Sequence, residues 1–261
     1  MFHKWDPVFS RSLEEIRHPQ YLHQSMNHVY IILVEPIYQG NVGAVARIMN
    51  NFELSHLRIV GSIPQKNDFY LAVHSEDILD NAELFPDLQS AIADLDRTIA
   101  VSRRKGKMKP VDMNPEMAGA YVQKNRTLKI GLVFGRETWG LTDEEAALCQ
   151  MRCYIPANPK FPSLNLAQAV SILTYEVYKN ADEKHEVEEI ADKKQFQDTK
   201  SYMLDVLGSI GFFQEEEPYD WSHIIDHMLA RMNPTKQMAY RLKQMFNRIH
   251  VAFHGKGKGY Q

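Results

Sequence analysis

Cysteine and long apolar runs are both scarce in this 261-residue chain, and each scarcity excludes a class of protein. Two cysteines, Cys149 and Cys153, cannot build a disulfide scaffold, which favours a protein of a reducing cytoplasm. The longest apolar run covers residues 29–34, whereas a membrane-spanning helix needs roughly 20 such residues. The first twenty residues have no apolar stretch followed by a small-residue cleavage site. We therefore expect a cytoplasmic protein with neither a membrane span nor a secretory signal.

Charge is nearly balanced overall but unevenly distributed. Thirty Lys and Arg face 33 Asp and Glu, and 44% of the residues are hydrophobic, as in ordinary globular proteins. Residues 180–220 carry twelve carboxylates and four lysines, whereas residues 231–261 carry seven Lys or Arg and no Asp or Glu. A second basic run covers residues 103–109. The two basic clusters favour a polyanion-binding face, and the alternative is a solvated loop and helix surface.

Short apolar runs alternate with helical patterns over residues 29–179, which predicts an α/β domain with a mostly parallel sheet. In such sheets ligands bind beyond the carboxyl ends of the strands. Residues 195–254 are helical by pattern, with a break at Asn233-Pro234. The predicted strands cover residues 29–34, 57–60, 98–102, 128–134 and 151–155, and the predicted helices begin at residues 40, 114, 142 and 165, with a weaker helical signal over 82–94.

The loop after the first predicted strand reads EPIYQGNVGAVAR, over residues 35–47. It leads into a helix whose first N–H groups could hold an anion. Its glycines, Gly40 and Gly43, do not form the dinucleotide fingerprint G-x-G-x-x-G, and no P-loop Lys-Ser/Thr follows. Arg47 lies one to two turns into the helix, on the loop side, and a surface salt bridge is the alternative to a functional role.

Two further loops carry unusual residues. An apolar strand ends at Gly135, where the missing side chain would let a ligand approach the backbone, and Glu137 follows in the same loop. Three prolines stiffen residues 156–162, after which Ser163 and Asn165 stand at a helix start. As an alternative, this serine and asparagine are ordinary N-cap residues.

In this order and spacing, three segments together resemble the motifs of one family. EPIYQGNVGAVAR, LVFGRETWGLTDEE and IPANPKFPSLNLAQAV resemble those of the SPOUT superfamily of S-adenosylmethionine (SAM)-dependent RNA methyltransferases, in its TrmH-like branch. The resemblance covers about residues 29–179, and residues 196–251 match more loosely a helical C-terminal extension of some members. It implies a tail over 1–26, an α/β domain with a deep trefoil knot over 27–180, a charged linker over 181–195, the helical extension over 196–254 and a flexible tail over 255–261.

The resemblance also implies a reaction, which is methylation of the ribose 2′-oxygen of a pyrimidine, C or U, at position 32 in the anticodon loop of tRNA. Another position of tRNA or ribosomal RNA is the alternative, as is a catalytically silent RNA-binding homologue. SAM is the implied cofactor, tRNA the partner, and the implied assembly is a homodimer with the active site at its interface. Neither a metal nor a membrane is implied.

Site residues follow from the resemblance, position by position. The implied catalytic residues are Asn41, Arg47 and Ser163. The implied cofactor-binding residues are Val101, Ser102, Arg103, Gly135, Glu137, Ile155, Pro162, Ser163, Leu164 and Asn165. Contacts with RNA are expected from Arg47, Arg103, Arg104, Lys105, Lys107 and Lys109, and which of Arg103 and Arg104 is the second functional arginine stays open.

One further pair of residues has the spacing of metal ligands. His223 and His227 lie four residues apart, a spacing that can hold zinc. The H-E-x-x-H glutamate and a nearby third ligand are missing, so an amphipathic helix is the favoured interpretation.

Overall fold

The protein is described by a computed structural model over residues 26–62, 71–102, 113–181, 189–214 and 219–255. Its described core is a six-stranded sheet in which every neighbouring pair of strands is parallel. The strands are β1 (Val29–Val34), β2 (His56–Val60), β3 (Glu83–Phe85), β4 (Arg97–Ser102), β5 (Ile130–Phe134) and β6 (Met151–Tyr154), in the order β3-β2-β1-β5-β4-β6. The predicted α/β class and its mostly parallel sheet are confirmed.

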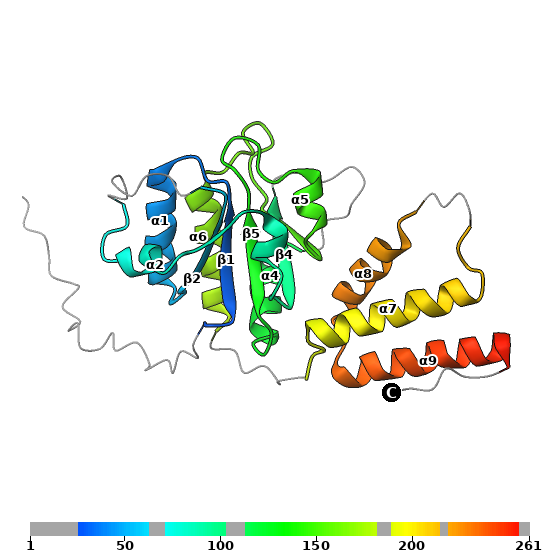
Figure 1. Cartoon of the computed structure of the whole chain (residues 1–261). Coiled ribbons are helices and arrows are strands. Elements are labelled where there is room, and N and C mark those ends of the chain that lie inside the picture. Colours follow the sequence, from blue (N-terminus) through cyan, green and yellow to red (C-terminus); the bar gives the residue numbers. More distant parts are fainter. Residues whose placement is uncertain (1–25, 63–70, 103–112, 182–188, 215–218, 256–261) are drawn as a thin grey trace, which may run out of the picture.

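The central strands β1 and β5 are apolar at almost every position because both of their faces are covered. On one face pack α1 (Gln39–Asn51), α4 (Pro115–Lys124) and α6 (Leu166–Lys179), with the short α2 (Glu76–Asp80) beside α1. On the other pack the short helices α3 (Leu88–Ala91) and α5 (Asp143–Ala147). Figure 1 shows α1 and α6 next to each other, with α5 near the edge where the strands end.

Local signals place several of these helices where the sequence predicts them. Asn114 caps α4 by accepting the N–H of Met117, with Pro115 in the first turn. Thr142 and Glu145 form the expected capping box at α5. Asn165 caps α6 in the same way.

Strand β6 has neighbours on both sides. It pairs with β4 on one side, and Met113 forms a parallel bridge with Cys153 on the other. Strand β6, which comes later in the chain, thus lies between β4 and Met113, which belong to one earlier stretch of chain. This arrangement is consistent with the knotted connection that the resemblance implies, and a path of that kind is nearly absent from other folds.

The helical signal over residues 82–94 was a wrong prediction for most of that segment. Glu83–Phe85 forms the edge strand β3, and only Leu88–Ala91 is helical. Pro86 separates the two, and Asp87 caps the short helix by accepting the N–H of Ser90. Three residues are too few for a period to identify a strand.

Three helices follow the sheet domain, namely α7 (Lys193–Ser209), α8 (Trp221–Met232) and α9 (Lys236–His254). The predicted break between the last two lies at Asn233, which adopts a left-handed conformation with φ 44°. Both histidines of the zinc-like pair lie within α8, and the described residues contain no cluster of metal ligands. Among the described helices none is long and apolar enough for a bilayer.

Buried polar contacts join these helices to the sheet domain. Arg97 is fully buried, donates to the carbonyl of Ala191 at 3.1 Å and lies 4.4 Å over the ring of Phe196. Asn233 accepts the hydroxyl of Tyr121 at 3.1 Å and donates to Asn125 at 2.6 Å. These contacts fix the C-terminal helices at the amino edge of the sheet, opposite the carboxyl ends of the strands.

Candidate active site

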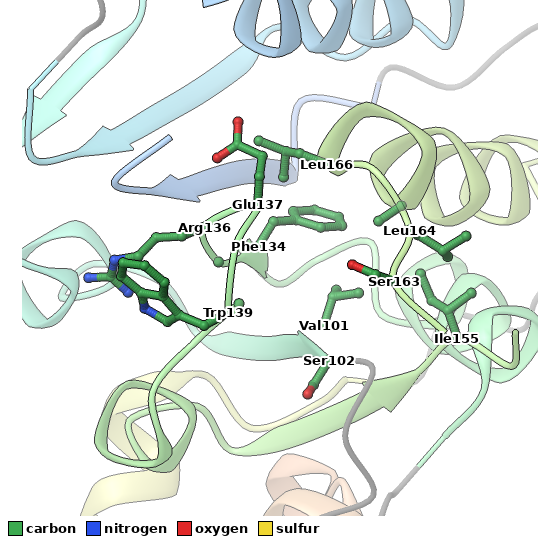
Figure 2. A pocket seen from close by; sticks show the side chains of 13 residues that line it. Val101, Ser102, Phe134, Arg136, Glu137, Trp139, Ile155, Ser163, Leu164 and Leu166 are labelled. Atoms are coloured by element: carbon green, nitrogen blue, oxygen red, sulfur yellow. The ribbon is translucent and has the colours of Figure 1, made fainter. Parts of the chain in front are cut away.

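A pocket opens at the carboxyl edge of the sheet, where open α/β sheets bind ligands. Its walls come from the ends of β4, β5 and β6 and from the loop that leads into α6 (Figure 2). The lining residues are Val101, Ser102, Phe134, Gly135, Arg136, Glu137, Trp139, Gly140, Ile155, Ser163, Leu164, Leu166 and Ala169.

Most of the predicted cofactor residues meet in this pocket. Val101, Ser102, Gly135, Glu137, Ile155, Ser163 and Leu164 all line it. Pro162 and Asn165 do not line it, and Arg103 lies outside the described residues. Phe134, Arg136, Trp139, Gly140, Leu166 and Ala169 also line the pocket and were not predicted, although all six lie within the second and third motif segments.

Gly135 is required by the fold of its own loop. The backbone of Arg136 and Gly140 is joined by two hydrogen bonds, at 3.3 and 2.8 Å, which turn the chain sharply back. A Cβ on Gly135 would lie 2.1 Å from the carbonyl carbon of Gly140 and 2.2 Å from the nitrogen of Leu141. Only glycine therefore allows this turn, which forms one wall of the pocket.

Glu137 serves the start of α1. Its carboxylate accepts the backbone N–H groups of Ile37 and Tyr38 at 3.0 and 3.2 Å, and the side-chain amide of Asn41 at 2.8 Å. Tyr38 occupies the N-cap position of α1 without capping it by its own side chain. The carboxylate thus satisfies the N–H groups of the N-cap residue and of the residue before it. Figure 2 shows it pointing away from Ser163.

Asn41 connects this carboxylate to the third motif. Its side-chain oxygen accepts the amide of Asn165 at 2.8 Å, while its own amide donates to Glu137. Asn165 in turn accepts the N–H of Ala167, and Gln168 accepts the N–H of Asn165. The three motifs, far apart in sequence, are thus linked by one chain of side-chain hydrogen bonds.

Arg136 stiffens the second motif. Its guanidinium binds both oxygens of Glu145 at 2.9 and 3.0 Å and donates to Glu35 at 2.8 Å. These hydrogen bonds with Glu145 and Glu35 raise the pKa of Arg136. Burial disfavours the charged form of Glu145, yet its interactions with Arg136 and its hydrogen bond from the N–H of Thr142 together outweigh burial and lower its pKa. The loop around the pocket is consequently held by the charge-assisted hydrogen bonds of Arg136 to two glutamates.

The predicted catalytic residues are not all at the pocket. Ser163 lines it, and Figure 2 shows its hydroxyl pointing into the space between Phe134 and Val101. Arg47 does not line the pocket of its own chain; its side chain is exposed on α1 and has no polar partner among the described residues. The predicted RNA-contacting residues Arg103, Arg104, Lys105, Lys107 and Lys109 lie outside the described residues.

Comparison with known proteins agrees with this geometry. The sequence profile of the SpoU rRNA Methylase family matches residues 28–175. The tRNA (cytidine-2′-O-)-methyltransferase TrmJ of Methanocaldococcus jannaschii is 42% identical over 156 residues, which cover 58% of this chain and 67% of that protein. The tRNA (cytidine/uridine-2′-O-)-methyltransferase TrmJ of Citrobacter koseri is 30% identical over 226 residues, covering 81% and 92%.

Structural similarity extends beyond the sheet domain. The crystal structure of TrmJ from Z. mobilis ZM4 superposes with a TM-score of 0.64 at 30% identity and covers 84% of this chain and 98% of that one. The alignment thus includes part of the C-terminal helices as well as the motifs. The chain belongs to the SpoU methylase family, and its similarity to TrmJ enzymes confirms the resemblance to the TrmH-like branch.

Proposed function

We propose that the protein transfers a methyl group from SAM to the ribose 2′-oxygen of a pyrimidine, C or U, at position 32 of tRNA. The pocket at the sheet edge carries this proposal, because it unites the second and third motifs and is linked to the first through Asn41. The TrmJ relatives are named for 2′-O-methylation of cytidine or uridine in tRNA. Because the name of the matching family refers to ribosomal RNA, ribosomal RNA is the second candidate substrate.

The pocket lining suits SAM. Val101, Phe134, Ile155, Leu164 and Leu166 offer buried or half-buried apolar surface to the adenine ring. The Glu137 carboxylate is engaged by three donors at the start of α1, so the polar edge of the adenine would be met by backbone groups of Ile155 and Leu164. When bound, SAM supplies the activated methyl group.

The residues of the chain then have to place and activate the ribose hydroxyl. A 2′-oxygen held about 3–3.5 Å from the methyl carbon gains much of the required rate enhancement from positioning. Ser163, with its hydroxyl directed into the pocket, orients the 2′-OH. A guanidinium is in effect always protonated, so Arg47 would bind the adjoining phosphate and stabilise the forming alkoxide rather than act as a base. Asn41 has both amide atoms engaged, so its role is to position α1.

The active enzyme is a homodimer in this proposal. Arg47 is absent from the pocket of its own chain yet exposed on α1, close in sequence to the exposed side chains of Ile37 and Tyr38. A second copy that packs on this surface would bring its own Arg47 to the pocket. The same proposal divides the chain into a tail, a methyltransferase domain and a helical extension. It also includes a cytoplasmic location, with tRNA as the substrate.

Basic residues of the C-terminal helices would add RNA contacts. Arg231 in α8 and Lys236, Arg241 and Arg248 in α9 are exposed. Each phosphate contact releases counterions, so the affinity for tRNA should fall steeply between low and physiological salt. An affinity that hardly changes over this range would contradict the basic-face hypothesis.

Two experiments test the function. Arg47→Ala should keep SAM affinity in calorimetry but lose most methyl transfer from tritiated SAM to tRNA, whereas Lys194→Ala, a charge change at the exposed start of α7, should leave both intact. Normal turnover by Arg47→Ala would refute its role. Mass-spectrometric mapping of nucleosides in tRNA from a deletion strain identifies the target, and failure of the unaltered protein to bind SAM would favour a silent homologue.

A further inference from the structure

A second cavity, of about 530 Å³, lies beside the SAM pocket, beyond the ends of β1 and β2. It shares Arg136 and Trp139 with that pocket, and Figure 2 shows these two side chains extending together away from Ser163. The turn at residues 135–140 therefore forms a wall common to both cavities. The second cavity is lined by Glu35, Pro36, Ile37, Gly61, Ser62, Arg136 and Trp139.

Trp139 presents a flat aromatic surface at this cavity. Its side chain is 51% exposed, and the guanidinium of Arg136 lies 5.8 Å from the centre of a ring. Arg136 is itself held by Glu35 and Glu145, so the indole stands against a rigid support. A large aromatic side chain that is fixed but half exposed at the mouth of a cavity is well suited to stack on a planar ligand.

Glu35 lines the cavity and has a strained backbone conformation. Its φ of 43° is left-handed, which is uncommon for residues other than glycine, and Gly61 at the end of the adjacent strand also has a positive φ, of 90°. Backbone strain of this kind persists where the surroundings enforce it and is concentrated at functional sites. One carboxylate oxygen accepts from Arg136 at 2.8 Å, and the other accepts no hydrogen bond from a described residue.

We propose that this cavity binds a nucleobase of the RNA substrate, stacked on Trp139, with an exocyclic amino group donating to the remaining oxygen of Glu35. Bases that are splayed from single-stranded loops are commonly stacked on aromatic side chains. Three Arg136 donors are directed at carboxylates, which leaves the remaining oxygen of Glu35 as an acceptor for a ligand. An amino-bearing edge such as that of cytosine matches acceptors better than the carbonyl edge of uracil. The inference rests on the proposed methylation of RNA.

Kinetics with tRNA give the first test. Trp139→Ala should raise the KM for tRNA roughly five- to hundredfold, the change that about 1–3 kcal/mol of stacking produces. Trp139→Phe keeps an aromatic face and should recover most of this loss. Tyr219→Ala, which removes an exposed aromatic residue beside α8, serves as the control. Because Trp139 also lines the SAM pocket, the Kd for SAM is measured for each variant by calorimetry. A KM for tRNA that changes only as much as SAM binding would overturn the inference.

Fluorescence provides a test that does not depend on turnover. The chain has three tryptophans, so the variant Trp5→Phe/Trp221→Phe leaves Trp139 as the sole one. Titration with oligocytidylate should quench its emission to saturation, with weaker binding of oligouridylate, and Glu35→Gln should reduce that difference. Emission unaffected by either RNA overturns the nucleobase site. The nucleobase site is also overturned if Trp139→Ala dissociates a dimer without loss of RNA binding, because Trp139 would then be a contact between copies. Quenching without methyl transfer would refute the proposed function while supporting the nucleobase site.

Discussion

Asn41 donates its side-chain amide to Glu137 across 2.8 Å, and this bond joins α1 to the loop after β5 over 96 residues of sequence. The same carboxylate accepts the N–H groups of Ile37 and Tyr38. A helix that lacks a capping side chain of its own is thus capped from another motif. The geometry of the first motif therefore depends on the second.

Glu137→Gln should weaken both stability and activity. An amide has one acceptor oxygen where the carboxylate has two, and its NH₂ group would face the donors at the start of α1. Leaving such groups unpaired costs about 1–3 kcal/mol of unfolding free energy, measurable by urea denaturation. Methyl transfer should fall together with the free energy of unfolding. Glu53→Gln makes the same chemical change at an exposed site just beyond the end of α1. Equal losses in the two variants would show that capping by Glu137 contributes nothing.

Gly135→Ala should disrupt the pocket loop. The new Cβ would lie 2.1 Å from backbone atoms that cannot move without opening the turn. We expect loss of SAM binding in calorimetry and a lowered melting temperature. Gly208→Ala is the matched control, because its Cβ would meet nothing closer than 3.6 Å and alanine favours a helix by about 1 kcal/mol. An alanine variant at position 135 that binds SAM normally would contradict the close approach.

Local chemistry explains what the sequence could predict. Strands β1 and β5 are continuous apolar runs, and Asn114, Thr142 and Asn165 mark the starts of the helices that they cap. These features depend on a few neighbouring residues. The short edge strand β3 was missed, because three residues that pair only with β2 leave no periodic pattern.

The site was predictable only in part, since its key contacts are long-range. The motifs located Gly135, Glu137 and Ser163, but no spacing reveals that the Glu137 carboxylate turns toward α1. Nor could a single arginine such as Arg136 be assigned to Glu35 and Glu145 before the fold brought them together. Arg47 lies on α1 as predicted. In the proposed function, its role requires a second copy of the chain.

Asp94 should contribute stability that is lost in acid. Its hydrogen bond with Arg58 lowers its pKa to about 2 from an ordinary value of 3.8. A lowered folded-state pKa means that this contribution is present above the unfolded-state pKa of 3.8 and is lost as the pH falls through about 2. Because the carboxylate is half exposed, the pair should be worth less than about 1 kcal/mol.

The free energy of unfolding, measured as the pH is lowered, tests this contribution of Asp94. Asp94→Asn should be less stable than the unaltered protein at pH 6, and this deficit should be clearly smaller at pH 2, as measured by urea denaturation. Asp198→Asn, at an exposed position of α7, should leave the difference unchanged across this range. A stability deficit of Asp94→Asn that stays constant from pH 6 to pH 2 would show that ionisation of Asp94 is not its source.

Asn233 should control how firmly the C-terminal helices are held. Its side chain accepts the hydroxyl of Tyr121 and donates to Asn125, and burial raises the pKa of Tyr121 to about 12, so that hydroxyl remains a donor. Asn233→Gly suits the left-handed backbone but removes both bonds, whereas Asn233→Ala also adds roughly 1–2 kcal/mol of backbone strain.

Protection against proteolysis around residues 233–236 should therefore be lower in Asn233→Gly than in the unaltered protein, and lower still in Asn233→Ala. SAM affinity should not change, because none of these residues lines the pocket, while the KM for tRNA should rise if the helices present basic residues to RNA. Equal protease resistance in Asn233→Gly and the unaltered protein would mean that packing around Phe196, rather than these hydrogen bonds, holds the helices against the sheet domain.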